Sequence, residues 1–202
     1  MPRTSERGGP QTRARIREIA NGMFIERGFD NVTVAEIARE AGVSTVTVFN
    51  HFPSKEDLFL DRVDDAVEFL QSAVRERDPG VDVLESLRRT TLGLVDARHP
   101  VTGLDARSLP FFRTVATSPA LVARARAIAA LLQRTLADEL ERAEDFAGDA
   151  GLFAALFIGG YSAVLVGTAA RALAGEDLEI LLVGHRARFE LLFESLRGGI
   201  PL

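Results

Sequence analysis

The most constraining stretch of this sequence runs from Thr33 to Leu58 and contains several helix-start signals in close succession. Thr33 stands three residues before Glu36, which is the spacing of a capping box. Gly42 is the residue type that most readily ends a helix in a left-handed conformation, and Ser44 follows as a second N-cap. Two short helices joined by so tight a turn predict a helix-turn-helix motif, whose second helix can enter the major groove of DNA.

The second of these helices has two distinguishable faces. Val48 and Phe52 lie one turn apart, and we expect them to face inward. Methyl groups of threonine and valine suit the 5-methyl group of thymine, and an asparagine can pair with adenine through two hydrogen bonds. The positions expected to face outward, toward a groove when DNA is bound, are Thr45, Val46, Thr47 and Asn50.

A third cap-and-acid pair, Ser54 and Asp57, predicts another helix beginning near Lys55. The ten residues from Phe49 to Leu58 are FNHFPSKEDL. With the helix-turn-helix pattern before it, this stretch resembles the N-terminal domain of the TetR (tetracycline-repressor) family of transcriptional regulators. The resemblance is specific over about residues 12–60, and it is consistent in length and helical character beyond them.

The resemblance implies which residues meet DNA. In the family, positions matching Thr33, Thr45, Phe49, His51 and Lys55 typically touch phosphates or bases. With the outward face and the second cap added, the candidate DNA-binding residues are Thr33, Ser44, Thr45, Val46, Thr47, Phe49, Asn50, His51 and Lys55.

The chain departs from the family at two points. A phenylalanine stands where the family usually has a tyrosine, so a hydroxyl contact to phosphate is lost at Phe49. The recognition helix also has no Lys or Arg, whereas many relatives carry a lysine near Thr45. We therefore expect affinity to depend on helix N-termini, on Lys55 (the only lysine of the chain) and on arginines of the first helix and the arm.

Charge is distributed unevenly along the chain. The net charge is −5, but residues 1–55 hold eight Arg or Lys against six Asp or Glu, and residues 56–202 hold sixteen against twenty-three. A mildly basic head on an acidic body suits a sequence-specific DNA-binding protein better than a general polyanion binder. The absence of cysteine excludes disulfides and thiolate metal sites and fits a cytoplasmic location.

The periodicity of apolar residues predicts an all-α protein of about nine helices. We divide it into an N-terminal arm and helix-turn-helix domain, residues 1–58, and a helical effector-binding and dimerisation domain, residues 59–202. Residues 1–10 are either a disordered start or a basic arm that touches DNA. Residues 101–117 form the least regular stretch of the body.

The resemblance implies a small-molecule effector bound in the helical body. Candidate pocket residues are aromatic, apolar or cationic side chains near the irregular stretch, and each has ordinary core packing as its alternative role. They are Phe69, Leu87, Thr91, His99, Arg107, Phe111, Phe112, Arg113, Phe153, Phe157 and Tyr161. An apolar lining favours a hydrophobic effector and an arginine anchor favours a carboxylate or phosphate, and the sequence leaves both open.

Residues 152–170 are nineteen consecutive uncharged residues, long enough for a membrane span. The Gly159–Gly160 pair, the many alanines and the lack of flanking cations favour a packed helix instead. Small residues every fourth position form a ridge that allows close approach of a second helix, either of this chain or of a second subunit. In the resembling family the last two helices pair two subunits, and the candidate interface is Ala155, Gly159, Ala163, Gly167, Leu182, Phe189 and Phe193.

The sequence lacks the common catalytic motifs, including a nucleophile elbow, a phosphate loop, a zinc-protease helix and a cysteine nucleophile. We therefore expect neither an enzyme nor a bound cofactor or metal. The leading hypothesis is a homodimeric repressor that a small molecule releases from a palindromic DNA operator. The alternatives are an activator, or a helical regulator or adaptor controlled by a protein partner.

Overall fold

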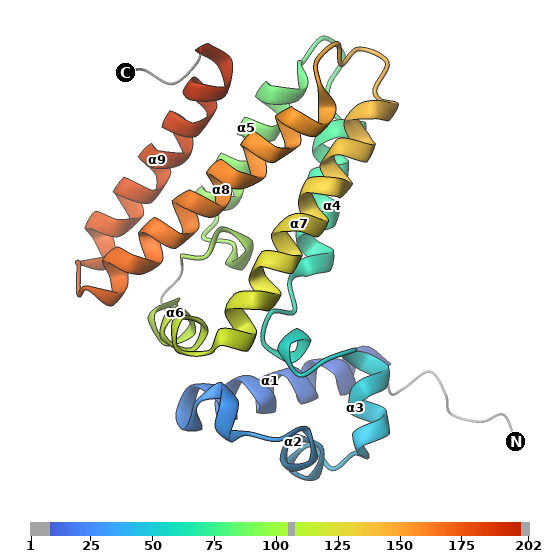
Figure 1. Cartoon of the computed structure of the whole chain (residues 1–202), viewed down its shortest axis with the longest axis vertical. Coiled ribbons are helices and arrows are strands. Elements are labelled where there is room, and N and C mark those ends of the chain that lie inside the picture. Colours follow the sequence, from blue (N-terminus) through green and yellow to red (C-terminus); the bar gives the residue numbers. More distant parts are fainter. Residues whose placement is uncertain (1–8, 105–107, 199–202) are drawn as a thin grey trace, which may run out of the picture. The chain divides into compact units, whose positions relative to one another are not determined.

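The computed structural model describes residues 9–104 and 108–198, and these residues form α-helices and short 3-10 helices without any strand (Figure 1). The expected all-α class is confirmed, with nine α-helices among the described residues. They are α1 (Gly9–Arg27), α2 (Val34–Glu40), α3 (Thr45–His51), α4 (Val63–Arg75), α5 (Val83–Asp96), α6 (Ser108–Thr117), α7 (Pro119–Arg142), α8 (Ala150–Leu173) and α9 (Leu178–Gly198). The 3-10 helices are η1 (Phe29–Asn31), η2 (Glu56–Leu58) and η3 (Pro100–Thr102).

The chain divides into two compact units. The first, which we call the head, contains the chain up to Asp61 together with Arg113–Arg124. The second, the body, contains Arg62–Phe112 and the chain from Ala125 onward. The helices α6 and α7 each contribute residues to both units.

In the head, α1 packs against both short helices that follow it. Its buried residues Ile16, Ala20 and Phe24 recur every fourth position and so lie on one face of the helix. The residues Val48 and Phe52, which the sequence predicted to face inward, are also buried. A short α-helix has little intrinsic stability in water, because nucleation costs more than a few hydrogen bonds return. The seven-residue helices α2 and α3 therefore depend on this shared core.

The third predicted helix start gives only the single turn η2. The cap itself forms: the Asp57 amide donates to Ser54 Oγ at 3.2 Å, and Ser54 Oγ donates to Asp57 Oδ2 at 2.7 Å. The consecutive residues Leu58 and Phe59 are then both buried, and Phe59 meets the Phe24 ring edge-on at 5.7 Å. This packing fixes the turn, and α4 begins separately at Val63.

The stretch 101–117 is more regular than we expected from its sequence, because α6 occupies Ser108–Thr117. Pro110 falls in the first turn of this helix, where a missing amide hydrogen costs little. Burial of Phe112 against Leu104, Ala172 and Leu181 supplies the tertiary stabilisation that local propensity does not.

In the body, α9 packs against α8 and α5, and α5 packs against α4 (Figure 1). The largest core cluster includes Leu87, Phe157 and Phe193. Glycines lie where α8 and α9 approach: a Cβ on Gly160 would lie 2.2 Å from the Leu192 side chain and one on Gly167 would lie 2.2 Å from the Arg188 guanidinium, so either side chain would have to move.

A buried histidine joins three elements of the body. His185 of α9 is 2% exposed; its Nδ1 lies 2.8 Å from Thr168 Oγ1 of α8 and its Nε2 lies 2.9 Å from the Thr102 carbonyl oxygen of η3. Burial lowers the pKa of His185 below its ordinary value. The neutral ring satisfies both contacts if Nε2 donates to the carbonyl and Nδ1 accepts from the threonine, so His185 acts here as a structural residue.

Helix α8 is the one described single helix long and apolar enough to cross a membrane by length and composition, a test that core helices also pass. The bent pair α6–α7 meets the same criterion only when the two helices are taken together. Buried positions of α8, among them Ala154, Phe157, Val164 and Thr168, face the body core. These contacts favour a packed helix over the membrane interpretation.

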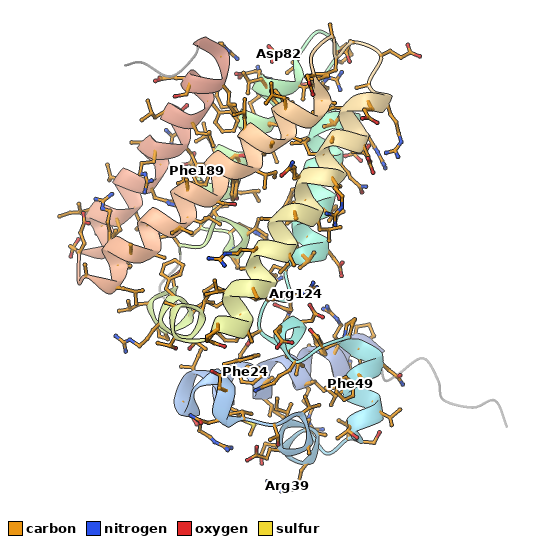
Figure 2. All side chains as sticks on the ribbon, in the orientation of Figure 1. Phe24, Arg39, Phe49, Asp82, Arg124 and Phe189 are labelled. Carbon is orange, nitrogen blue, oxygen red and sulfur yellow. The ribbon has the colours of Figure 1, made fainter. Side chains whose placement is uncertain are left out.

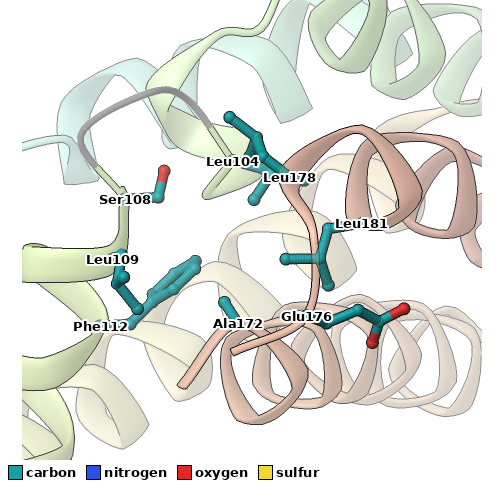
Figure 3. A pocket seen from close by; sticks show the side chains of 8 residues that line it. All are labelled: Leu104, Ser108, Leu109, Phe112, Ala172, Glu176, Leu178 and Leu181. Atoms are coloured by element: carbon teal, nitrogen blue, oxygen red, sulfur yellow. The ribbon is translucent and has the colours of Figure 1, made fainter. Parts of the chain in front are cut away.

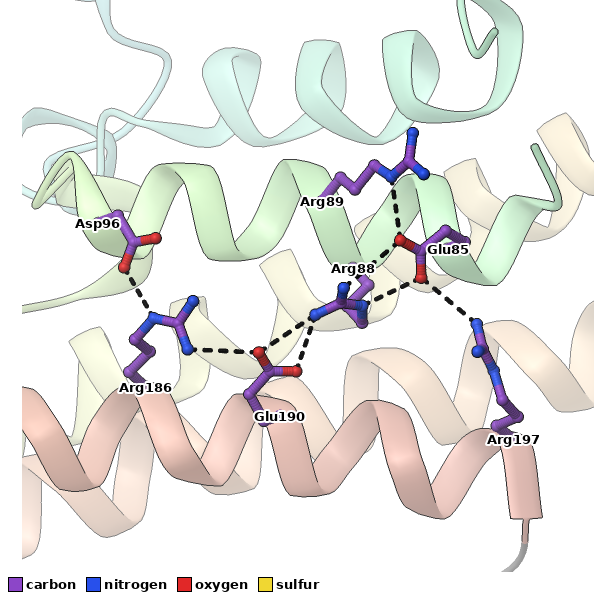
Figure 4. Close-up of polar contacts among 7 residues, drawn as sticks. All are labelled: Glu85, Arg88, Arg89, Asp96, Arg186, Glu190 and Arg197. Atoms are coloured by element: carbon purple, nitrogen blue, oxygen red, sulfur yellow. Dashed lines mark hydrogen bonds and ion pairs between the residues drawn. The ribbon is translucent and has the colours of Figure 1, made fainter. Parts of the chain in front are cut away.

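A network of ion pairs connects α5 to α9 on the surface of the body (Figure 4). Arg88 lies 3.0 Å from both Glu85 and Glu190, and Arg197 lies 3.4 Å from Glu85. The pKa of Glu85 is lowered to about 2, chiefly by its hydrogen bonds from Arg88 and then Arg89. Because the pKa is lowered in the folded state, the contribution of Glu85 to stability is present above its ordinary pKa and is lost as the pH falls toward 2.

We predict that Glu85→Gln lowers the melting temperature at pH 7 by a small amount, on the order of 1–3 °C, because the pairs lie at the surface and are partly accessible to solvent. The difference from the unmodified protein should shrink between pH 5 and pH 2, since a glutamine resembles a protonated glutamate. Thermal melts across this pH range test it. The control is Glu179→Gln, an exposed residue of α9 outside the network; equal melting temperatures of Glu85→Gln and the unmodified protein at pH 7 would contradict the prediction.

Candidate nucleic-acid interface

The helix-turn-helix begins with a complete capping box. Thr33 Oγ1 accepts from the Glu36 amide at 3.2 Å, and Glu36 Oε2 accepts from the Thr33 amide at 2.8 Å. The carboxylate of Glu36 also accepts from Arg27 at 2.7 Å. The hydrogen bond from Arg27, followed by those from Thr33, lowers the pKa of Glu36 to about 2. The start of α2 is thereby fixed to the end of α1.

The turn and the second cap have the expected geometry. Gly42 has φ +64°, in the left-handed region that a side chain would strain. Ser44 Oγ accepts from the Thr47 amide at 3.0 Å and lies 2.9 Å from Thr47 Oγ1. Both hydroxyl groups thus take part in capping α3.

One face of α3 is solvent-exposed and carries no charge. Val46 is 66% exposed and Phe49 is 50% exposed, and Thr45 and Asn50 are exposed beside them (Figure 2 labels Phe49). Thr47 and His51 are half-buried. Helical spacing brings positions 45, 46, 49 and 50 onto one surface, which we call the recognition face.

The lysine that the resemblance assigned to DNA contact has partners inside the head. Lys55 Nζ donates to the Phe29 carbonyl oxygen at 2.6 Å and stands 4.2 Å from the centre of the Phe29 ring. Desolvation lowers the pKa of Lys55, partly offset by Asp30, Glu56 and Glu36. The ammonium group therefore links the turn before η2 to η1.

Two arginines near the turn are candidates for DNA contact: Arg15 is one of the first-helix arginines that the sequence indicated, whereas Arg39 of α2 was not indicated. Arg15 and Arg39 are exposed, and among the described residues neither has an ion-pair partner. The Arg15 guanidinium lies against the turn, where a Cβ added to Gly42 would be 3.4 Å from Nη2. Arg39 occupies the last turn of α2 (Figure 2). By contrast, Arg17 is paired with Asp61.

The segment joining α6 to α7 also belongs to the head. Ser118 is 2% exposed, and its hydroxyl donates to Asp30 Oδ1 at 3.0 Å. Arg124 Nε donates to Asp57 Oδ1 at 2.8 Å (Figure 2 labels Arg124). These bonds connect the segment to η1 and η2, the same two elements that Lys55 links.

The predicted effector residues do not form one cavity. Leu87 and Phe157 lie in the main core cluster, and Thr91 is buried on α5. Phe69 and His99 form an edge-on ring pair at 5.1 Å, and the Tyr161 hydroxyl donates to the Val101 carbonyl oxygen at 3.4 Å. Arg113 belongs to the head, Phe111 packs beside Phe112, and Arg107 lies outside the described residues.

Two small cavities stand out in the body. The first, about 190 Å³, is largely apolar and joins α6 to the turn between α8 and α9 (Figure 3). Its lining is Leu104, Ser108, Leu109, Phe112, Ala172, Glu176, Leu178 and Leu181. Glu176 there is paired with Arg171, whose Nε donates to it at 2.6 Å. The second, about 170 Å³, includes Leu84 and Phe153. Of these lining residues, the sequence indicated only Phe112 for the first cavity and Phe153 for the second. The others could not be indicated, because cavities form between elements that are distant in sequence.

The candidate dimer residues separate into three groups by burial. Gly159 and Ala163 are exposed, and a Cβ on Gly159 would meet nothing within 4 Å. Ala155, Gly167 and Leu182 are half-buried, and Gly167 faces Arg188 of the same chain. Phe189 and Phe193 are buried in the body core. The exposed apolar residues of α8 and α9 that the sequence analysis did not name are Leu152, Leu156, Val166, Leu173, Leu178, Ile180, Val183 and Leu191.

Within the part of the chain that the structure describes, no group of three His, Asp or Glu side chains is placed to hold a metal ion. His51 belongs to the head, while His99 and His185 belong to the body.

Comparison with known sequences places the N-terminal region in context. A family profile described as "Bacterial regulatory proteins, tetR family" matches residues 16–61. An uncharacterised HTH-type transcriptional regulator of Haemophilus influenzae is 31% identical over 70 residues, which cover 35% of this chain and 34% of that protein. An HTH-type transcriptional regulator of Staphylococcus aureus is 42% identical over 48 residues, covering 24% of this chain and 26% of that protein. The matched region therefore spans only about a third and a quarter of these two relatives.

Solved structures share the fold over nearly the whole chain. The complex of SmeT with triclosan has a TM-score of 0.61 at 18% identity and covers 95% of both chains. The Thermus thermophilus FadR, a TetR-family transcriptional repressor in complex with lauroyl-CoA, has a TM-score of 0.58 at 25% identity. That alignment covers 94% of this chain and 95% of the other.

We predict that Lys55→Met destabilises the protein by about 1–2 kcal/mol, because the Phe29 carbonyl loses a charge-assisted donor while the apolar stem is kept. Chemical denaturation followed by circular dichroism measures it. The matched control is Arg39→Met, which also removes a positive charge from the head but breaks no side-chain hydrogen bond or ion pair within residues 9–104 and 108–198. Equal stability of the two variants would show that the Lys55 contact contributes nothing.

Proposed function

Because this chain belongs to the TetR family of bacterial regulatory proteins, we propose that it is a homodimeric repressor that a small molecule releases from a palindromic operator. Members of this family are DNA-binding transcription factors and not enzymes. The observation that carries the proposal is the capped helix-turn-helix with an exposed recognition face on α3. A repressor of this kind would act in the cytoplasm, where the chromosome is accessible.

We assign the DNA contacts by position around α3. The recognition face supplies Thr45, Val46, Phe49 and Asn50 for base contacts. Thr33, Ser44, Thr47 and His51 stay in the proposed interface at its margin. Lys55 does not, because its ammonium group already serves the Phe29 carbonyl.

Phosphate contacts must then come from other cations of the head. Arg15 lies beside the turn and Arg39 in the last turn of α2, and both are exposed. Neither forms an ion pair with another residue of the described part of the chain. Guanidinium groups bind phosphate oxygens through two parallel hydrogen bonds. We propose that these two arginines replace the lysine in contacting the DNA backbone.

Dimerisation is proposed through α8 and α9. Their outer surfaces carry Leu156, Gly159, Ala163 and Val166 on α8 and Val183 on α9, all exposed in the single chain. Positions 156, 159, 163 and 166 recur at helical spacing on α8, and exposed apolar residues gathered on one face of a helix favour an interaction site. A two-fold axis through it would present two recognition helices to half-sites about 34–36 Å apart.

For the effector, we propose the cavity between α6 and the α8–α9 turn. It is mainly apolar, with Ser108 and Glu176 as polar groups, and the similar structures named above hold triclosan and lauroyl-CoA. Helix α6 supplies Leu109 and Phe112 to this cavity and continues into the head from Arg113 onward. A molecule bound there would change the helix that both units share, and so bias the head between DNA-competent and incompetent states.

The small volumes of the two cavities favour a second candidate function, a regulator controlled by a protein partner. Drug-sized ligands usually occupy about 300–1,000 Å³, more than either cavity provides. A regulator controlled by a protein partner needs no such cavity.

We predict that the full-length protein retards a duplex from the region upstream of its own gene in a gel-shift assay, with salt-sensitive affinity. Asn50→Ala should weaken binding by about 1–3 kcal/mol and relax the preference at one base pair, because an adenine loses a bidentate partner. Arg39→Gln is the contrasting variant: it should weaken all duplexes alike and reduce the salt slope by about one unit. No specific binding at low salt would refute the repressor proposal.

We predict that Gly159→Leu and Ala163→Leu each shift the protein toward monomer in sedimentation velocity, because the added side chain separates the two subunits. The matched control is Gly22→Leu, an exposed glycine of α1 with open space around it, as at Gly159. Stable dimers in both α8 variants would remove this surface as the interface.

We predict that at least one compound in a thermal-shift set containing triclosan and lauroyl-CoA stabilises the protein and releases it from the operator duplex. Ala172→Phe should abolish both effects, because the ring fills the cavity between α6 and α9. Leu84→Phe, placed at the second cavity, is the control and should retain them. Stabilisation that persists in Ala172→Phe would exclude this cavity, and no stabilising compound would favour partner control.

A further inference from the structure

Two large apolar side chains of the head are exposed side by side. Val46 and Phe49 are 66% and 50% exposed, and they lie one helical turn apart on α3. The only other large hydrophobic residue of the described head with comparable exposure is Ile25 of α1, at 45%. Apolar area left in water is unfavourable, so an adjacent pair of this kind favours a partner that covers it.

The other groups on the recognition face narrow the chemistry of that partner. Thr45 and Asn50 flank the apolar pair, and α3 contains no Lys, Arg, Asp or Glu. Guanine is recognised best by Arg or Lys, and cytosine by a carboxylate acceptor. Neither is present here. Asparagine instead matches adenine, and apolar side chains match the methyl group of thymine.

We propose that Val46 and Phe49 select A·T base pairs in each half-site by packing against thymine 5-methyl groups. The inference rests on the proposed DNA-binding function and names the chemistry that gives it specificity. Phe49 is then a base-contacting residue whose ring covers a methyl group, in place of the phosphate contact that a tyrosine hydroxyl would make. Asn50 pairs with adenine on the same face.

The expected size of the effect follows from apolar burial. Removing one contacted methyl group from the DNA should weaken binding about threefold to tenfold, the effect of a buried methyl group in a well-packed contact. Methyl groups outside the contact should have almost no effect. Deoxyuridine is the appropriate probe, because it differs from thymidine only by that methyl group and keeps the base pairing.

The experiment uses the full-length protein and a duplex selected by it from a random library. Each thymine of one half-site is replaced by deoxyuridine, one position at a time, and affinity is measured by fluorescence anisotropy. We expect a threefold to tenfold loss at one or two positions. In Val46→Ala or Phe49→Ala the loss at the matching position should disappear, because the methyl group no longer has its contact.

The matched control is Ile25→Ala, which also truncates an exposed hydrophobic residue of the head. It should retain the full deoxyuridine effect. Circular dichroism verifies that the variants are folded, as expected for side chains that are half or more exposed.

The outcomes separate this inference from the proposed function. Specific binding that tolerates deoxyuridine at every position would overturn methyl recognition and leave DNA binding intact. A deoxyuridine effect that persists unchanged in both α3 variants would assign the methyl contact to other residues and also overturn the inference. Failure to select any duplex would refute the proposed function and this inference together.

Discussion

Everything proposed for this protein at DNA depends on the small hydrophobic core of the head. Helices α2 and α3 have seven residues each, too few to be stable alone. They are held because Ile37 and Val48 are buried with Ile16 and Phe24 of α1. The caps at Thr33 and Ser44 then satisfy backbone amides that short helices leave unpaired. Because burial fixes one face of α3, the side chains of the opposite face are held at defined positions in solvent. These defined positions make an uncharged recognition face useful for the proposed DNA binding.

The positive charges of the head differ in the partners that the fold gives them. The sequence favoured Lys55 as a phosphate contact, since it sits in a motif typical of the family. In the folded head its ammonium group is used by the Phe29 carbonyl and ring. Arg27 and Arg17 are likewise used in ion pairs. Arg15 and Arg39 are exposed, and their positions beside the turn and in the last turn of α2 suit the proposed contact with the DNA backbone. The number of cationic residues in the sequence does not show which of them are available to contact DNA phosphates.

In the body, the glycines of α8 belong to two different surfaces of that helix. One surface packs against α9 of the same chain, and the other is proposed to meet a second subunit. Gly160 and Gly167 allow α9 of the same chain to approach, since a Cβ there would overlap Leu192 or Arg188. Gly159, next in sequence, points to open space and lies among exposed apolar residues. The small residues that recur every fourth position along α8 therefore do not face a single neighbour, because Gly167 faces Arg188 of α9 and Gly159 faces open space. The buried His185 and the ion pairs between α5 and α9 hold the chain's own packing in place, which leaves the outer surface of α8 for the proposed second subunit.

The sequence by itself determined the all-α class, the capped helix-turn-helix and the division of α3 into a buried and an exposed face, because caps and helical periodicity are local and act within a few residues. It did not determine α6, whose helix is stabilised by Phe112 packing on residues distant in sequence, or the early end of η2. It also did not determine the partner of Lys55, the lining of the two cavities or the inward position of Phe189. These features depend on which distant elements meet, and only the tertiary structure decides that.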